Sequence, residues 1–255
     1  MKFTPLLLFC WATACAQPIH YTTAQAHSHN DYRQPVPFWT AYQHGFGSIE
    51  ADIFLVRGEL IVAHDTQELK QHHTLDQYYL QPVLSSIRKN GGYIYADSTR
   101  QLQLLIDIKT DSIGTLNALI QLLNRYPVLI NTSSVKWVIS GNRPSPELFS
   151  AYPAYIWFDA ELQKEYSAAA WSRIAMLSDN FARYSRWKGV GKLPEKELLL
   201  SVIKGARQHN IPARLWNAPD NEEAWKELMG LQVDFLNTDS IAPLDNYLKR
   251  LPLAR

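Results

Sequence analysis

Short β-rich runs alternate with helical stretches along this chain, and that alternation limits the possible folds more than any other feature. Parallel strands need a crossover connection, usually a helix, so the pattern predicts a parallel sheet. Eight runs have the length and residue types of strands: 21–27, 48–54, 103–108, 135–140, 154–158, 174–178, 212–217 and 233–237. Helices are expected over 112–125, 195–209 and 221–230, with Pro194 in a first turn and Asp220 as an N-cap. The pattern favours a closed single-domain (β/α)8 TIM barrel, and an open doubly wound sheet shares it.

Composition agrees with one domain. The chain has 255 residues, of which 46% are hydrophobic, and (β/α)8 barrels usually need about 250 residues. A formal net charge of +1 argues against a nucleic-acid-binding groove, which normally requires clustered lysine and arginine. The sequence contains no low-complexity linker and no tandem repeat that would indicate a second domain.

The N-terminus has the features of a signal peptide. Lys2 precedes an apolar stretch at 6–11, and the tripeptide Ala-Cys-Ala at 14–16 resembles a cleavage site. The stretch is too short to cross a bilayer, so a transmembrane anchor is not expected. We therefore predict a signal peptide at 1–16, one TIM-barrel domain over 17–255, and an exported protein, periplasmic or secreted.

The cysteines lie in this same segment. Cys10 and Cys15 are the two cysteines of the chain, so the processed protein would contain neither a disulfide nor a thiol nucleophile. Lipidation of Cys15 is an alternative that would make the chain a lipoprotein, although Ala12 stands where a large aliphatic residue is expected. The remaining chemistry then depends on His, Asp, Glu, Lys, Ser and Tyr.

Three carboxylates are expected at the ends of two neighbouring strands. In the run 48–54, Glu50 and Asp52 alternate with apolar residues and therefore share one face, and Asp107 has the same position on the next strand. Carboxylates that lie this close repel each other unless a cation is present. Hard oxygen ligands suit Mg²⁺ or Ca²⁺, and the alternative is a salt-bridge network formed by Lys109 and an arginine.

Two histidines flank these acids in the sequence. His27 ends the first predicted strand, and His64 lies in an Ala-His-Asp sequence that follows a turn at Arg57-Gly58. Both are expected at the C-terminal face, where barrel enzymes have their active sites. One imidazole can remove a proton or act as nucleophile, while the other protonates the leaving oxygen of a phosphodiester.

The ordered set of motifs resembles the glycerophosphodiester phosphodiesterase and phospholipase-C-like superfamily. The matching pieces are Ala26-His27, Glu50-x-Asp52, His64-Asp65, Asp107-x-Lys109, Arg214-Leu215-Trp216-Asn217 and the closing segment 233–239. The resemblance implies a (β/α)8 barrel with Mg²⁺ or Ca²⁺ held by three acids. It makes Glu50, Asp52 and Asp107 the metal ligands, His27 and His64 the catalytic pair, and Lys109, His29, Asn30 and Trp216 the residues that bind phosphate or substrate. Trp216 could instead pack inside the barrel.

Departures from the family pattern leave the substrate open. The sequence His27-Ser28-His29-Asn30-Asp31-Tyr32 replaces the usual His-Arg-Gly, and Asp107 replaces a glutamate. This is closer to an H-S-H-N-D-Y group that includes fungal mitochondrial-inheritance proteins, and to sphingomyelinase-D-like phospholipases. We therefore expect a small-molecule or lipid phosphodiester as substrate, cleaved by water or by cyclising transfer, and a monomer.

Two other functions are compatible with a barrel of this kind. A non-catalytic exported binding barrel could keep the fold and the ion, although it would not need two histidines together with three acids. A metal-independent phosphatidylinositol phospholipase C would carry an arginine in place of the ion, and the three carboxylates argue against it.

Overall fold

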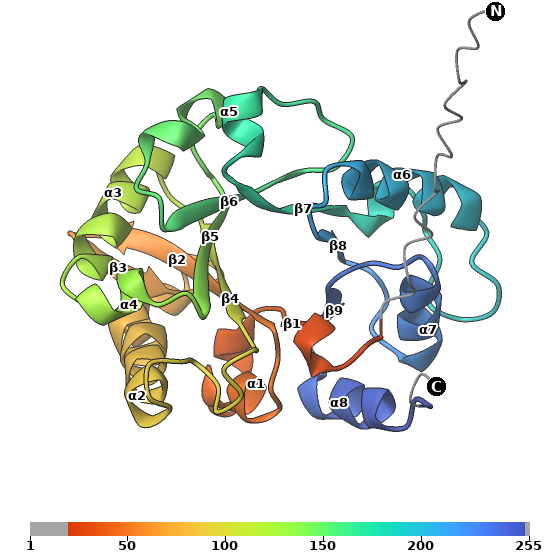
Figure 1. The fold of residues 1–255 in the computed structure, drawn as a ribbon, viewed down its shortest axis with the longest axis horizontal. Helices are drawn as coiled ribbons and strands as arrows, with labels where there is room; N and C mark the ends of the chain where they lie inside the picture. The colour runs from red at the N-terminus through yellow and green to blue at the C-terminus, as the bar shows by residue number, and fades with distance from the viewer. Residues whose placement is uncertain (1–19, 253–255) are drawn as a thin grey trace, which may run out of the picture.

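The computed structural model describes residues 20–252, and its centre is a nearly closed ring of parallel strands surrounded by helices (Figure 1). The eight parallel strands are β1 (Ala26–Ser28), β2 (Ser48–Val56), β4 (Leu102–Ile108), β5 (Val135–Gly141), β6 (Ile156–Glu161), β7 (Ile174–Asn180), β8 (Ala213–Trp216) and β9 (Leu236–Thr238). Their order is β8-β7-β6-β5-β4-β2-β1-β9. An isolated bridge between Arg214 and Phe235 joins the two ends of this order. The predicted (β/α)8 barrel is confirmed.

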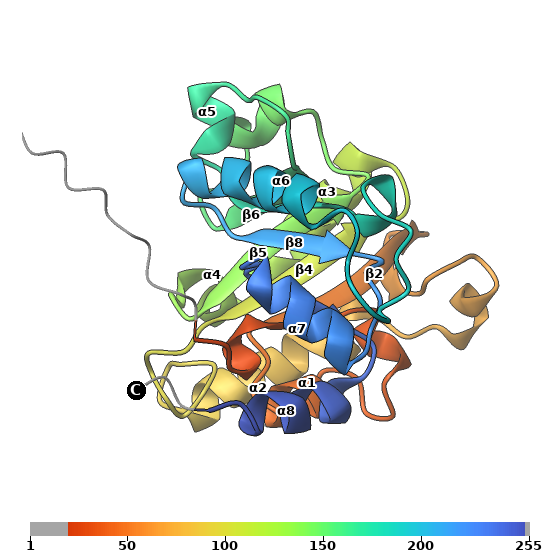
Figure 2. The same cartoon turned by 90° about the vertical axis from the view of Figure 1, so that its right-hand side faces the viewer.

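Helices cover the outside of the ring. They are α1 (Trp39–Gln43), α2 (Gln81–Lys89), α3 (Ser112–Leu123), α4 (Pro127–Asn131), α5 (Ala168–Trp171), α6 (Lys196–Gln208), α7 (Glu222–Gly230) and α8 (Ile241–Lys249). In the side view, α6 and α7 lie over the strands and the long connections extend beyond the tip of the β8 arrow (Figure 2). Among residues 20–252, the structure has no helix that is both long and apolar enough to span a bilayer.

The strands separate two apolar layers because successive side chains point to opposite faces. On β4, Leu104 and Ile106 belong to the large core between sheet and helices. Leu105 points the other way and joins Val138 and Met176 in a small cluster inside the ring. This inner cluster lies below the C-terminal ends of the strands, where the inward-pointing side chains become polar.

An additional strand distinguishes the structure from the predicted pattern. β3 (Glu59–Val62) returns antiparallel to β2 after a turn in which Arg57 and Gly58 both have positive φ. The hairpin carries the chain from the end of β2 to His64, so it decides where that histidine lies.

Three local predictions were wrong. The run 21–27 forms a strand only from Ala26, because Thr22 and Gln25 make a capping box around a 3-10 helix, Thr23–Gln25. Pro194 precedes the N-cap of α6, Glu195, and lies outside its first turn. Asn221, and not Asp220, caps α7 by accepting from the Ala224 amide; the Asp220 carboxylate accepts from Trp225 Nε1 at 2.9 Å and from the Asp239 amide at 3.0 Å.

Candidate active site

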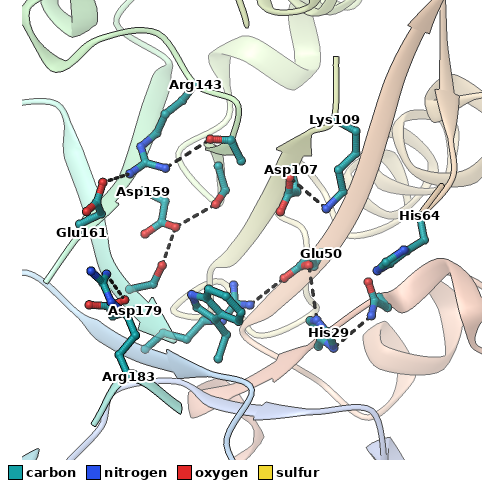
Figure 3. Close-up of a pocket in the computed structure, with 16 residues that line it drawn as sticks. His29, Glu50, His64, Asp107, Lys109, Arg143, Asp159, Glu161, Asp179 and Arg183 are labelled. Atoms are coloured by element: carbon teal, nitrogen blue, oxygen red, sulfur yellow. Dashed lines mark hydrogen bonds and ion pairs between the residues drawn. The ribbon is translucent and has the colours of Figure 1, made fainter. Parts of the chain in front are cut away.

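A pocket of about 430 Å³ opens at the C-terminal ends of the strands, and two polar walls face each other across it (Figure 3). The first, which we call the β1–β4 wall, consists of His29, Asn30, Glu50, His64, Asp107 and Lys109. The second, the β5–β7 wall, consists of Ser140, Arg143, Asp159, Glu161, Ser178, Asp179 and Arg183. Arg214 and Trp216 of β8 also line the pocket. Seven of the nine residues predicted for the site therefore lie on one cavity, and His27 and Asp52 lie beneath it.

The three predicted metal ligands converge. Asp52 and Asp107 are partners in the β2–β4 register, and Glu50 lies two residues before Asp52 on the same strand face. One carboxylate oxygen from each of the three lies within 4.8 Å of the others. Glu50 and Asp52 are buried and Asp107 is half-buried, so water screens their repulsion poorly.

Two cations partly neutralise this cluster, as the salt-bridge alternative expected. Lys109 Nζ lies 3.0 Å from Asp52 Oδ2 and 3.2 Å from Asp107 Oδ1. The buried Arg214 guanidinium lies 2.9 Å from Glu50 Oε2. Burial opposes ionisation of Glu50, yet Arg214 and His27 hold the pKa of its carboxyl below the usual range. Burial likewise opposes the charged form of Lys109, and the two aspartates keep its pKa raised.

The negative charge is nevertheless not fully compensated. Burial, together with the charges of Glu50 and Asp107, raises the pKa of Asp52 to about 7. Burial also raises the pKa of Asp107. Within residues 20–252, Asp52 Oδ1 is buried without a hydrogen-bond partner. Three oxygen donors with an unsatisfied atom among them are a set that suits a hard divalent cation such as Mg²⁺ or Ca²⁺.

His27 and His29 have different surroundings, although both come from the first strand and its end. His27 is fully buried, with Nδ1 2.7 Å from Ser48 Oγ and Nε2 2.8 Å from Glu50 Oε2. Burial and the nearby Arg214 lower the pKa of its imidazole to about 3. His29 lies on the pocket, with Nδ1 2.8 Å from Asp239 Oδ1. Burial opposes its protonation, but the hydrogen bond to Asp239 and the charge of Glu50 leave its pKa raised.

His64 reaches the pocket from the hairpin. It is exposed, lines the cavity two residues after β3, and its backbone N–H donates to Glu68 Oε2 at 2.7 Å. Glu68 thereby holds the backbone at this histidine, whose ring points towards Glu50 and His29 (Figure 3).

Asn30 holds the turn after β1. Its φ of 46° is in the left-handed region, which asparagine tolerates better than most residues. The Tyr32 hydroxyl lies 2.7 Å from Asn30 Oδ1 and 2.9 Å from Asp52 Oδ2, so one tyrosine contacts both the turn and the carboxylate cluster.

Trp216 lies at the mouth of the pocket and does not pack inside the barrel. It ends β8, is 38% exposed and lines the cavity. Its indole face is therefore available to a ligand that extends from the β1–β4 wall.

Sequence reasoning missed the β5–β7 wall. The strand predicted at 154–158 ends one residue before Asp159, whereas β6 continues to Glu161. The alternation of Phe158, Asp159, Ala160 and Glu161 is the same signal that identified Glu50 and Asp52, and Ser178 gives it again on β7. The sequence analysis included Arg214 in a motif but gave it no role. Its contact with Glu50 joins residues 164 positions apart, and a local pattern cannot predict such a contact.

Comparison with known families and structures agrees with this geometry. Residues 18–127 match the model of the AIM6-like phosphodiesterase domain, and residues 212–241 match the glycerophosphoryl diester phosphodiesterase family. A glycerophosphodiester phosphodiesterase from Parabacteroides distasonis has the same fold, with a TM-score of 0.57 at 16% identity over 88% of this chain and 96% of that one. A second, from Agrobacterium tumefaciens, has a TM-score of 0.50 with the same identity and coverage. The two family matches and the shared fold support the resemblance to the glycerophosphodiester phosphodiesterase and phospholipase-C-like superfamily.

Proteins that are similar in sequence include several from fungi. Altered inheritance of mitochondria protein 6 from Kluyveromyces lactis is 24% identical over 87% of this chain and 71% of its own length. The protein of the same name from Eremothecium gossypii is 26% identical over 88% and 69%, and a homolog from Arthroderma benhamiae is 25% identical over 87% and 82%.

These relatives overturn one prediction. Their names refer to the inheritance of mitochondria, so the prediction of an exported, periplasmic or secreted protein is wrong. The physical reason is that a charged residue followed by a short apolar stretch is a weak signal, since apolarity alone does not specify a destination. The predicted signal peptide at 1–16 and the predicted lipid site at Cys15 lie outside the described residues.

Proposed function

We propose that this chain is a metal-dependent phosphoric diester hydrolase that acts on a glycerophosphodiester or a lysophospholipid-type diester. One observation carries the proposal: three carboxylate oxygens lie within 4.8 Å of one another beside a pocket that also contains two histidines and a lysine. Phosphodiester cleavage needs positive charge at the phosphoryl oxygens and groups that transfer protons, and this wall has both.

The residues of the β1–β4 wall take separate tasks. Glu50, Asp52 and Asp107 would hold a divalent cation, Mg²⁺ or Ca²⁺, which would polarise the phosphoryl group and offset its developing charge. Lys109 is half-buried and lies between two of these acids, so its ammonium can contact a phosphoryl oxygen at the same place. His29 and Asn30 line the same surface and would bind the phosphate from the β1 side.

Proton transfer is the task of two histidines, one of which is His64. Its ring is exposed on the pocket and can protonate the leaving oxygen or deprotonate a water or a substrate hydroxyl. The predicted partner is His27, whose Nε2 contacts Glu50 within the cluster. His29 is a competing candidate, because it already faces the cavity and its raised pKa favours the protonated form.

A non-catalytic ligand-binding barrel is the alternative function. The ion pairs of Lys109 and Arg214 with the acids, and the two hydrogen bonds that hold His27, are what a stable binding protein would also contain. Under this alternative the pocket would still bind a phosphate ester, but it would not turn a diester over.

Turnover distinguishes the two functions. The purified chain is assayed with bis(p-nitrophenyl) phosphate, glycerophosphodiesters and lysophospholipids, with EDTA and then with Mg²⁺ or Ca²⁺ restored. We expect activity that EDTA abolishes and one of the ions restores, and product analysis then separates hydrolysis from cyclising transfer. Full activity in a His27→Ala/His64→Ala double variant, or activity that resists EDTA, contradicts the mechanism. Tight binding of phosphate esters without turnover of any diester supports the binding barrel.

A further inference from the structure

We propose that the β5–β7 wall is a subsite for a polyhydroxylated ring, such as a sugar or a cyclic polyol, attached to the phosphodiester. The inference rests on the proposed function to the extent that the phosphoryl group occupies the β1–β4 wall. It adds the chemical class of the group on the opposite side of the pocket.

Asp159 is the centre of this subsite. It is 3% exposed and lies on the pocket, facing the carboxylate cluster (Figure 3). Its Oδ2 accepts hydrogen bonds from Ser140 Oγ at 2.8 Å and from Ser178 Oγ at 2.6 Å. Its Oδ1 is buried and has no hydrogen-bond partner among residues 20–252. Buried carboxylate oxygens are rarely left without a donor, so Oδ1 is in position to accept one from a ligand.

The two serines restrict what that ligand must offer. Each hydroxyl has one proton, and both protons point to Asp159, so the serines face the pocket only as acceptors. The centre of the wall therefore accepts hydrogen bonds and donates none, and its ligand must bring N–H or O–H groups.

The flanking residues offer hydrogen-bond partners to hydroxyl groups. Arg143 and Arg183 stand on the same wall as three acids, so charges of both signs face the pocket. Arg143 Nη1 donates to the Gly141 carbonyl oxygen at 3.4 Å, whereas Nη2 lies 3.9 Å from Glu161 Oε1, which is too long for a hydrogen bond, so Nη2 can still donate to a ligand. Arg183 Nη1 lies 2.8 Å from Asp179 Oδ1. Donors and acceptors thus alternate along the rim, and a hydroxyl can satisfy either kind.

Trp216 completes a site for a ring. It lines the same cavity and is 38% exposed, so one face of the indole is open to the C–H face of a saturated ring. A quaternary ammonium would instead need several aromatic faces around it, and Trp216 is the one Phe, Tyr or Trp side chain among the residues that line this pocket in the described part of the chain.

Binding of matched phosphate monoesters tests the subsite without depending on turnover. Isothermal titration with Mg²⁺ present compares glucose 1-phosphate and myo-inositol 1-phosphate with cyclohexyl phosphate, which has a six-membered ring and no hydroxyl. We expect the two hydroxylated esters to bind the wild type at least about tenfold more tightly.

Asp159→Asn is the decisive variant. The asparagine keeps an acceptor for the two serines but replaces the charged acceptor Oδ1 with a neutral NH₂ donor. The charge-assisted hydrogen bond to a ligand hydroxyl is then lost, so the preference for hydroxylated esters should fall about tenfold while cyclohexyl phosphate binds unchanged. Glu165→Gln is the matched control, because it removes the same charge from an exposed position outside the pocket. Glu161→Gln, on the exposed rim of the wall, is the second variant and should lower the preference by a smaller factor, even if Asp159→Asn does not fold.

The outcomes separate the two proposals. A wild type that binds cyclohexyl phosphate as tightly as the hydroxylated esters overturns the subsite, as does an equal loss for all three esters in Asp159→Asn. Failure to hydrolyse bis(p-nitrophenyl) phosphate and every glycerophosphodiester and lysophospholipid tested overturns the proposed function but leaves the binding ratio as a valid result for the subsite. Hydrolysis without any hydroxyl preference overturns the subsite alone.

Discussion

The two walls of the pocket come from neighbouring strands of one sheet, yet their central carboxylates have different neighbours. On the β1–β4 wall, three acids crowd together and need cations, which Lys109 and Arg214 supply in part. On the β5–β7 wall, Asp159 stands apart from them and two neutral hydroxyls stabilise it. The first arrangement suits the binding of charge and the second suits the binding of hydroxyl groups. Carboxylates on both walls therefore lie at the ends of barrel strands, and the groups in contact with each carboxylate determine what it can bind.

The largest expected effect is on the β1–β4 wall. Asp107→Asn keeps an oxygen at this position but removes one of the three negative charges that would hold the cation. It should lower kcat about 1000-fold, because the developing charge is then less well offset. It should also abolish the rise in melting temperature that Mg²⁺ or Ca²⁺ produces in the wild type. Asp65→Asn, at an exposed residue beside His64, is the control and should leave both unchanged. A loss of activity without a loss of the metal-induced stabilisation would separate Asp107 from the ion.

The histidines of the same wall come next. His64→Asn should lower kcat by about 100- to 10,000-fold, the range for loss of a general acid or base. His27→Asn and His29→Asn decide which histidine is its partner. Substitution of the true partner should remove one limb of the pH–rate profile. Substitution of a histidine that only positions other groups should leave both limbs in place. Loss of the same limb in both variants would mean that the two imidazoles act together.

Asp31 is a buried carboxylate near the β1–β4 wall whose effect can be measured as a pH dependence of stability. It is buried behind the β1–β4 wall, and both of its oxygens have donors: Ser28 Oγ at 2.8 Å, the Phe38 amide at 2.6 Å and Tyr79 OH at 3.1 Å. Burial raises the pKa of its carboxyl to about 6, from an ordinary value of 3.8. Because the folded state holds the proton more tightly, this group favours folding at low pH, and that contribution is lost as the pH rises through 6.

Asp31→Asn tests this pH dependence. Between pH 4 and pH 8, the free energy of unfolding of the wild type should fall by about 3 kcal/mol relative to the variant. Urea unfolding at several pH values measures the difference, with Asp65→Asn as the exposed control. Parallel curves for wild type and Asp31→Asn would show that its three donors fully offset the burial.

The smallest expected effect is at the mouth of the pocket. Trp216→Ala removes an exposed aromatic face and should raise KM for a ring-bearing diester about fivefold, corresponding to about 1 kcal/mol, with little change in kcat. KM for bis(p-nitrophenyl) phosphate serves as the comparison. An equal change in kcat would indicate that Trp216 acts on the β1–β4 wall instead.

Much of the fold and half of the site follow from local sequence patterns. The alternation on β2 and β4 identified Glu50, Asp52 and Asp107, because a period of two fixes which face each side chain occupies. Asp159 and Glu161 were missed because the predicted end of β6 came too early, and strand ends depend on pairing with neighbours. The burial of His27 could not be predicted, since it depends on Ser48, Glu50 and the distant Arg214 packing around it.

The seam between β8 and β9 has a consequence for the whole ring. An isolated bridge joins these segments, and the Arg214 side chain adds a clasp across it, with Nε 2.9 Å from Asn237 Oδ1. The same guanidinium also donates to Glu50, so one residue both helps to close the barrel and contacts the acidic cluster. A ligand that drew the Glu50 carboxylate away from Arg214 would remove one of the contacts made at this seam, so ligand binding and closure of the barrel depend on the same side chain.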